Sequence, residues 1–246
     1  MRIAVCFSGQ TRTSTEAFPN LRRFFGTAFE NIDFFIHTWD ISYQKKTFRR
    51  EESPRLKVPQ ERFDQLVNFY NPKKIEIEHY EENSSLYYHP PMYYSWYKSV
   101  MLCRNHEIEN NFRYDAVVKL RTDIIFPSFR FFMSNLEYYL TDTDKFYIQG
   151  MTHNRADDVY WMSNSDNMVN ATMFVKKMAG NHDIEFIDFL REINMTPKEL
   201  APTMESYTIL RDECLHLDVL KDFKGCFECD HHHYGACDTP WGIGFD

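Results

Sequence analysis

The 246-residue sequence lacks several features that would assign its class at once. No apolar run approaches the length of a membrane span, so we expect no integral membrane segment. The N-terminus has no signal-peptide pattern, and the chain has no internal repeat, low-complexity tract or convincing linker. A chain of this length can bury a sizeable core. We therefore predict a single domain over residues 1–246.

The charge and cysteine content exclude further classes. Acidic residues outnumber basic ones by 36 to 28, so no overall positive field attracts nucleic acid, and no nucleic-acid partner is expected. The six cysteines are scattered and partly embedded in apolar runs, which fits a reducing compartment and a cytoplasmic location better than a disulfide framework. Aromatic residues make up 17% of the chain; an aromatic cleft for sugars or bases is one interpretation, but an aromatic core explains most of them.

Apolar runs at residues 2–7, 33–37 and 115–120 predict buried parallel strands, separated by helical patterns. The predicted fold is α/β, with a mainly parallel central sheet flanked by helices. The charged residues 41–59 are expected to form an excursion from it. Further strands are predicted at 73–79, 146–148 and 159–162, and helices at 18–29, 59–70, 90–112, 166–178, 183–193 and 203–217.

The most informative stretch is the strand-like run that ends in Arg121-Thr122-Asp123. Residues two apart in an extended segment point to the same face, so Arg121 and Asp123 should lie side by side. They would stand at the carboxyl end of the strand, where open α/β sheets bind ligands. The pair suits a ligand that carries phosphate charge together with a metal ion or hydroxyls. The alternative is a surface ion pair that closes the strand.

Polar residues also follow the first two predicted strands. The loop Ser8–Thr15 has small and hydroxylated residues that allow close approach by a phosphate or ribose, and Arg12 adds positive charge. It is neither a P-loop nor the three-glycine dinucleotide fingerprint, and a plain strand-helix turn is the alternative. At the end of the second strand, Trp39 could stack on a base and Asp40 could accept a hydrogen bond from a ribose hydroxyl.

Five segments in order carry a family resemblance: Ser8-Gly9-Gln10-Thr11-Arg12, His37-Thr38-Trp39-Asp40, Met92-Tyr93-Tyr94-Ser95-Trp96-Tyr97-Lys98, Arg121-Thr122-Asp123 and Asp158-Val159-Tyr160-Trp161. Over roughly residues 2–175 the chain resembles nucleotide-sugar-dependent glycosyltransferases found in bacterial surface-polysaccharide loci and in large viruses and phages. That family has the GT-A type of fold, a Rossmann-like sheet with one active site. The resemblance implies a nucleotide-sugar donor, an oligosaccharide or other glycan acceptor, and a role in polysaccharide biosynthesis.

On the donor side, the resemblance places Arg121-Thr122-Asp123 where the family has its Asp-x-Asp signature, which reaches the diphosphate, its metal and the donor sugar. It implies a Mn²⁺ or Mg²⁺ ion with Asp123 as a ligand, and His233 of the His231-His232-His233 run could supply the second; an exposed histidine cluster is the alternative. Arg121 replaces the first acid and can itself neutralise phosphate, so a metal-free site stays open. The implied donor-binding residues are Ser8, Gly9, Gln10, Arg12, Trp39, Asp40, Ser95, Lys98, Arg121 and Asp123.

On the acceptor side, an inverting enzyme needs a carboxylate base within hydrogen-bond reach of the attacking hydroxyl. Asp157 and Asp158, just before a predicted short strand, are the leading candidates, and Glu205 is the second. The alternatives are a solvated turn for the two aspartates and, for Glu205, a first-turn acid favoured by the helix dipole.

Two competing interpretations remain. Cys226, Cys229 and Cys237, with the intervening histidines, have spacing compatible with a structural zinc, or they are reduced thiols beside a polar tail. The chain could also be a non-catalytic nucleotide- or glycan-binding protein with the same fold, an alternative that Arg121 in the Asp-x-Asp position supports best. Phosphoryl or sulfuryl transfer is disfavoured because the P-loop is missing.

Overall fold

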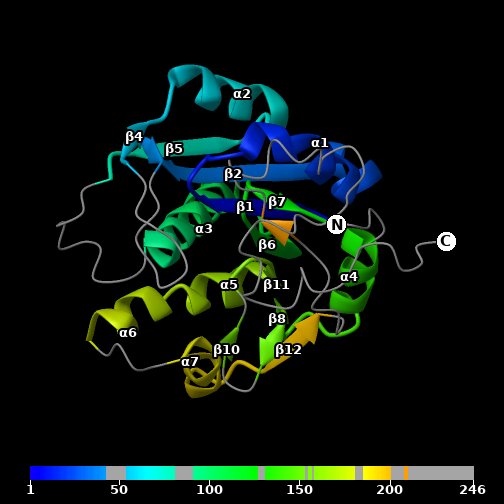
Figure 1. Cartoon of the computed structure of the whole chain (residues 1–246). Coiled ribbons are helices and arrows are strands. Elements are labelled where there is room, and N and C mark those ends of the chain that lie inside the picture. The colour runs from blue at the N-terminus through cyan, green and yellow to red at the C-terminus, as the bar shows by residue number, and fades with distance from the viewer. Residues whose placement is uncertain are drawn as a thin grey trace, which may run out of the picture.

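Seven strands form the central sheet, in the order β12-β8-β11-β6-β1-β2-β5 (Figure 1). The computed structural model describes residues 1–42, 54–80, 91–126, 131–152, 155–156, 158–180, 185–200 and 208–209. Strand β11 is antiparallel to both of its neighbours, and every other neighbouring pair is parallel. The predicted mainly parallel α/β sheet is confirmed. Its strands are β1 (Ile3–Gly9), β2 (Ile32–Trp39), β5 (Lys74–Glu78), β6 (Ala116–Leu120), β8 (Phe146–Gln149), β11 (Trp161–Ser163) and β12 (Pro197–Leu200).

Helices cover both faces of the sheet, and its inner strands are accordingly buried and largely apolar. In β1, Val5 and Phe7 face the core beneath α1, α2 and α4, whereas Ala4 and Cys6 face the core beneath α3, α5, α6 and α7. None of the described helices is long and apolar enough to cross a membrane. They are α1 (Ser14–Phe25), the 3-10 helix η1 (Gly26–Asn31), α2 (Gln60–Tyr70), α3 (Pro91–Asn110), α4 (Phe131–Tyr139), α5 (Ser165–Ala171), α6 (Phe174–Gly180) and α7 (Phe186–Glu192).

Aromatic side chains fill much of both cores, as the composition suggests. On the α1 side, the Phe24 ring stacks on Phe126 with centroids 3.8 Å apart. On the α3 side, Trp161 stacks on Phe186 at 4.4 Å and meets Trp96 edge to face at 4.7 Å. The high aromatic content is therefore largely structural.

Most predicted elements match the structure, and one does not. The helix predicted at 203–217 is wrong at Thr208–Ile209, which form strand β13 paired antiparallel with β7 (Ile124–Ile125). Both residues of β13 are β-branched and suit a strand, and pairing with a buried segment outweighs the local helical pattern. The rest of that range lies outside the described residues. The helix predicted at 166–178 is divided into α5 and α6.

Short strands also join the ends of the charged excursion. Strand β3 (Ile41–Ser42) pairs antiparallel with β4 (Leu56–Lys57), and the Val58 N–H donates to the Asp40 carbonyl at 2.8 Å. A second small pair is formed by β9 (Met151–Thr152) and β10 (Arg155–Ala156). The excursion therefore leaves and rejoins the fold close to the end of β2. Residues 43–53 lie outside the described part of the chain.

A buried carboxylate ties α3 to the start of β6 and to α5. Glu107, whose side chain is fully buried, accepts hydrogen bonds from the Tyr114 N–H at 2.7 Å, the Ser165 hydroxyl at 2.7 Å and Arg104 at 3.0 Å. A buried charge is tolerated when it is paired and hydrogen-bonded in this way. Glu107 therefore fixes the long helix against the sheet at the end opposite the strand carboxyl termini.

We predict that Glu107→Ala lowers the free energy of unfolding by about 3 kcal/mol, because it leaves buried donors without their acceptor. The measurement is urea unfolding followed by circular dichroism. The matched control is Glu109→Ala, on the same helix as Glu107. It removes an exposed ion pair with Lys74 of β5 and should lower the free energy of unfolding by less than about 1 kcal/mol. Equal losses in the two variants would contradict the role given to Glu107.

Candidate functional site

The predicted donor-side residues meet at one edge of the sheet. Strands β6, β1, β2 and β5 are parallel neighbours, so their carboxyl ends lie together. This brings the turn at Gly9, the β2 end at Asp40 and the β6 end at Arg121 to the same edge. Strand β11 runs in the opposite direction and pairs Trp161 with Lys119, so the residues before β11, including Asp158, also lie at this edge. Open α/β sheets bind their ligands there.

The loop after β1 has an unusual backbone. Gly9 has φ +114°, a value that favours glycine, and a Cβ added there meets no heavy atom within 4 Å. Arg12 also has positive φ, at 24°, which is uncommon for a residue with a side chain, and its Nε donates to Gln10 at 3.1 Å. Strained conformations of this kind concentrate at functional sites. The loop thus has room for a ligand beside its backbone.

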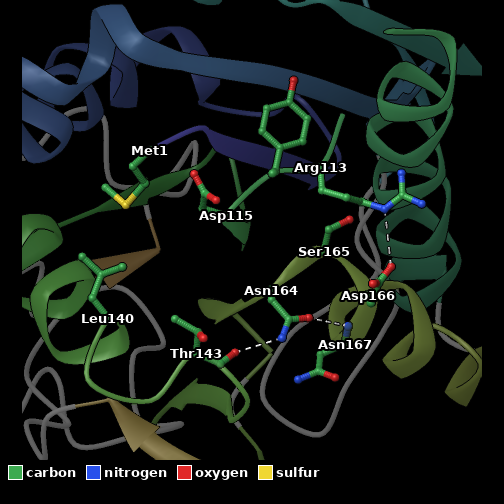
Figure 2. Close-up of a pocket in the computed structure, with 10 residues that line it drawn as sticks. Met1, Arg113, Asp115, Leu140, Thr143, Asn164, Ser165, Asp166 and Asn167 are labelled. Carbon is green, nitrogen blue, oxygen red and sulfur yellow. Dashed lines mark hydrogen bonds and ion pairs between the residues drawn. The ribbon is translucent and has the colours of Figure 1, made fainter. Parts of the chain in front are cut away.

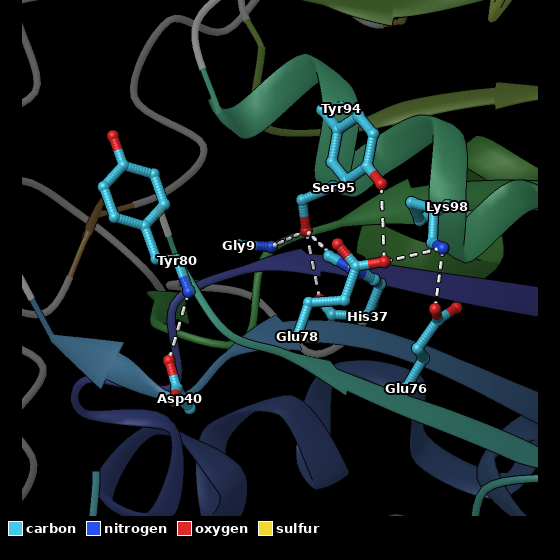
Figure 3. Close-up of polar contacts among 9 residues, drawn as sticks. All are labelled: Gly9, His37, Asp40, Glu76, Glu78, Tyr80, Tyr94, Ser95 and Lys98. Carbon is cyan, nitrogen blue, oxygen red and sulfur yellow. Dashed lines mark hydrogen bonds and ion pairs between the residues drawn. The ribbon is translucent and has the colours of Figure 1, made fainter. Parts of the chain in front are cut away.

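Ser95, on the first turns of α3, holds that loop in place. Its hydroxyl accepts from the Gly9 N–H at 2.7 Å, donates to the His37 carbonyl at 3.1 Å and lies 2.8 Å from His37 Nδ1 (Figure 3). Ser95 and His37 are both fully buried. Ser95 therefore braces the Gly9 turn in this structure, and its predicted direct contact with a donor stays a prediction.

The second nitrogen of His37 faces an acid-base cluster at the end of β5. His37 Nε2 lies 3.5 Å from Glu78, whose carboxylate lies 2.6 Å from Lys98 Nζ, and Lys98 is also 2.6 Å from Glu76 (Figure 3). Burial lowers the pKa of His37 to about 4, against the opposing attraction of Glu78. Partial burial opposes the charge on Lys98, but hydrogen bonds to the two carboxylates outweigh it and raise its pKa. Lys98, predicted to grip the donor, is paired with acids of this chain.

Trp39 and Asp40 also have protein partners. Trp39 is 1% exposed, and its ring lies 5.7 Å from Tyr94 and 5.4 Å from Tyr80. The Asp40 carboxylate accepts from the Tyr80 N–H at 3.2 Å and lies 2.7 Å from His79 Nδ1. Sequence reasoning missed Tyr80 and His79, although they directly follow a strand whose end is at this edge. Tyr80 and Tyr94 are half-buried, so they, and not Trp39, present aromatic surface at the edge.

Arg121 and Asp123 form a two-point ion pair, as in the alternative of a strand-closing pair, but the pair is buried and not on the surface. Arg121 Nε and Nη2 donate to the two Asp123 carboxylate oxygens at 2.8 Å and 2.7 Å. The Asp123 side chain is 2% exposed and that of Arg121 18%, so the pair is buried with the cation on the outer side. The Thr122 hydroxyl lies 3.5 Å from the Gln10 carbonyl, which joins this segment to the loop after β1.

This geometry does not suit the metal that the resemblance implies. A Mn²⁺ or Mg²⁺ ion needs oxygen ligands, and both Asp123 oxygens accept from the adjacent guanidinium. Within the described ranges, no group of three or more His, Cys, Asp and Glu side chains is placed to hold a metal. The second predicted ligand, His233, lies outside those ranges, as do the possible zinc ligands Cys226, Cys229 and Cys237.

Of the three predicted acids on the acceptor side, only Asp158 is described; Asp157 and Glu205 lie outside the described residues. Asp158 is half-buried, just before β11. Trp161, three residues after Asp158, pairs with Lys119 in the antiparallel neighbour β6, and Lys119 comes two residues before Arg121. The acid is therefore at the same edge of the sheet as Arg121 but on a neighbouring strand.

A cavity of about 700 Å³ lies at the opposite edge, where the parallel strands begin (Figure 2). Its polar side chains hold local structure: Arg113 lies 3.7 Å from Asp166, Asp115 accepts from the Arg2 N–H at 2.7 Å, and Asn164 accepts from an N–H of α5 at 2.8 Å. None of the predicted site residues lines it. Its lining is Met1, Arg113, Tyr114, Asp115, Leu140, Thr143, Asn164, Ser165, Asp166 and Asn167.

No protein-family model and no curated protein sequence matches the chain. Among solved structures, it is similar to a glycosyltransferase involved in the glycosylation of the major capsid of PBCV-1, at 6% identity and TM-score 0.41, over 81% of this chain and 82% of that one. It is also similar to a putative nucleotide-diphospho-sugar transferase from Desulfovibrio desulfuricans G20, at 7% identity and TM-score 0.44, over 97% of this chain and 94% of that one. A third similar structure is a cytidylyltransferase from Leptospira borgpetersenii, at 8% identity and TM-score 0.44, over 81% of this chain and 75% of that one. These likenesses are too distant to carry an argument, and the fold assignment rests on the sheet itself.

His37 should make the protein less stable in acid. Its pKa is about 4 in the folded protein, against an ordinary value of 6.5. Between these pH values the unfolded chain is protonated at His37 and the folded chain is not. Stability is then highest above pH 6.5 and is lost as the pH falls toward 4. We expect this group to account for a loss of about 2 kcal/mol between about pH 7 and pH 4.5.

Urea unfolding at these two pH values, compared between the wild type and His37→Gln, measures this contribution. The variant lacks the titrating ring, so its stability should fall less on acidification, whatever its stability at neutral pH. An equal fall in both proteins would show that His37 is not the group responsible.

Proposed function

We propose that the protein is a glycosyltransferase that moves a sugar from a nucleotide-sugar donor to a hydroxyl of a glycan acceptor. The observation that supports this most is the meeting of three features at the carboxyl edge of the sheet: the strained loop after Gly9, the Arg121–Asp123 pair and the acid Asp158. The first two suit a diphosphate, and the third suits the proton transfer that glycosyl transfer requires.

In the proposed reaction, the loop from Ser8 to Arg12 and the guanidinium of Arg121 face the diphosphate of the donor. The acceptor oxygen attacks the anomeric carbon, and a new C–O bond forms as the bond to the diphosphate breaks. The acceptor proton passes to the Asp158 carboxylate, and the nucleoside diphosphate leaves with the bonding electrons. Attack from the side opposite the leaving group makes the transfer inverting. Cations placed at the leaving oxygens stabilise the charge that develops there.

A base must have a free lone pair at the start of the reaction, and Asp158 meets this condition. Among the described residues, no hydrogen bond or ion pair engages its carboxylate. Asp40 and Asp123, by contrast, are each held at both oxygens by groups of this chain. This difference favours Asp158 as the base over the other acids described at the edge.

A non-catalytic protein that binds nucleotides or glycans is the second candidate. It is favoured by Arg121, which stands in the place of an acid and is already paired with Asp123. Hydrolysis of nucleotide sugars in the absence of acceptor separates the two candidates, because a binding protein should produce no free nucleoside diphosphate.

The first experiment is a thermal-shift screen with nucleoside diphosphates and nucleotide sugars. A ligand at 100 times its dissociation constant adds about 2.7 kcal/mol to the stability of the folded state, which raises the unfolding temperature measurably. We expect one nucleotide class to stabilise the protein. If no nucleotide or nucleotide sugar does, the proposed function is wrong.

We predict that Asp158→Asn lowers the turnover number for sugar transfer by about 10²- to 10⁴-fold, because asparagine keeps the size and polarity but cannot accept the proton. Donor affinity, measured by calorimetry, should be unchanged. The matched control is Asp166→Asn, an exposed acid at the other edge of the sheet, which should transfer at the wild-type rate. Wild-type turnover in Asp158→Asn would remove this residue as the base and leave Glu205 as the next candidate.

Arg12→Ala should weaken binding of the nucleoside diphosphate by about 1.5–3 kcal/mol, the range for hydrogen bonds to charged groups. Isothermal calorimetry measures the change. Arg113→Ala removes a half-exposed arginine at the opposite edge and should leave the affinity unaltered. Unchanged affinity in Arg12→Ala would place the diphosphate away from the loop after β1.

A further inference from the structure

The buried carboxylate of Asp123 already has its compensating charge. Both of its oxygens accept from Arg121, at 2.8 Å and 2.7 Å, and its side chain is 2% exposed. A buried acid of this kind needs a cation, which can be a bound metal ion or a side chain. Here the cation is supplied by the chain, two residues away on the same segment.

A divalent ion at Asp123 would meet two obstacles. It would have to displace at least one of the guanidinium hydrogen bonds, and it would then lie beside a guanidinium that stays positively charged at any ordinary pH. Like charges at such short range repel strongly where water is excluded. The arrangement therefore disfavours binding of a metal through Asp123.

Arg121 is the member of the pair that solvent, and therefore a ligand, can reach. Its side chain is 18% exposed, whereas that of Asp123 beneath it is almost fully covered. A guanidinium has five N–H donors in a rigid plane, and the two bonds to Asp123 fix the orientation of that plane. Thr122 also keeps this segment close to the loop after β1, where the diphosphate is expected to lie.

We propose that the Arg121 guanidinium, oriented by Asp123, takes the place of a divalent metal in holding the diphosphate of the donor. This inference rests on the proposed function and adds a specific charge partner to it. Arg121 is then a binding residue, and Asp123 is a positioning residue that acts through Arg121. The site should bind a diphosphate in the absence of any metal ion.

Calorimetry with inorganic pyrophosphate, uridine diphosphate and guanosine diphosphate tests this, because pyrophosphate reports on the diphosphate contact independently of base and sugar. Each titration is made in chelator and in excess MnCl₂, and MnCl₂ alone is titrated into the wild type. We expect binding in chelator that is no more than about threefold weaker than in MnCl₂, a difference of less than 1 kcal/mol. We also expect no saturable site for Mn²⁺ alone.

Three variants then separate the roles of the pair. Arg121→Gln should weaken binding in chelator by about 10- to 100-fold, whereas Arg113→Gln, at the far edge, should not change it. Asp123→Asn should weaken binding less than Arg121→Gln and should leave the response to MnCl₂ unaltered. Arg121→Asp places an acid on each side of Thr122, and diphosphate binding by this variant should become dependent on MnCl₂. Circular dichroism checks that each variant is folded.

The possible results differ in what they overturn. If the wild type binds the probes only in MnCl₂, or if Arg121→Gln binds normally in chelator, the inference is wrong while the proposed function stands. If MnCl₂ strengthens binding to the wild type but not to Asp123→Asn, Asp123 is a metal ligand and the inference also fails. If no probe binds in either buffer, the proposed function itself is overturned. The wild-type titrations decide the question even if a variant does not fold.

Discussion

The parallel pairing of β1 with β2 on one side and with β6 on the other is the constraint on which the candidate site depends. This pairing brings Gly9, Asp40 and Arg121 to one edge, although they are far apart in the sequence. The register is held by alternation in β1, whose odd-numbered residues from Ile3 to Phe7 enter one core and whose even-numbered residues enter the other. A slip by one residue would exchange these two sets. The position of the loop after β1 is therefore a consequence of core packing.

Two buried polar clusters on α3 differ in a way that matches their places in the fold. Glu107, near the C-terminal end of the helix, has three hydrogen-bond donors and simply locks the helix to the sheet. Ser95, near the other end, connects the Gly9 turn of the loop after β1 to His37, and through His37 to the acid Glu78. The first cluster fixes where α3 lies. The second cluster holds the Gly9 backbone of the candidate site at a fixed place relative to α3.

Sequence reasoning located the strands better than the contacts between them. The apolar runs of β1, β2 and β6 are long and bounded by polar residues, so the strands and the edge at which they end could be predicted. The hydrogen bond from Gly9 to Ser95 spans 86 residues, and no local pattern encodes it. Trp39 illustrates the same limit, because its place at a strand end was predictable, but its burial behind Tyr80 and Tyr94 depends on elements that meet only in the folded chain.

Arg121 and Asp123 show why a motif alone does not decide the chemistry of a site. On an extended segment, two residues of opposite charge on the same face can each contact a ligand, or they can pair with each other. The structure has them paired, with the acid buried and the base outside it. Such a pair can hold a diphosphate in an enzyme and in a binding protein alike, because it supplies charge and orientation but no proton acceptor. The distinction between the two functions therefore falls on Asp158, whose carboxylate has no such partner among the described residues.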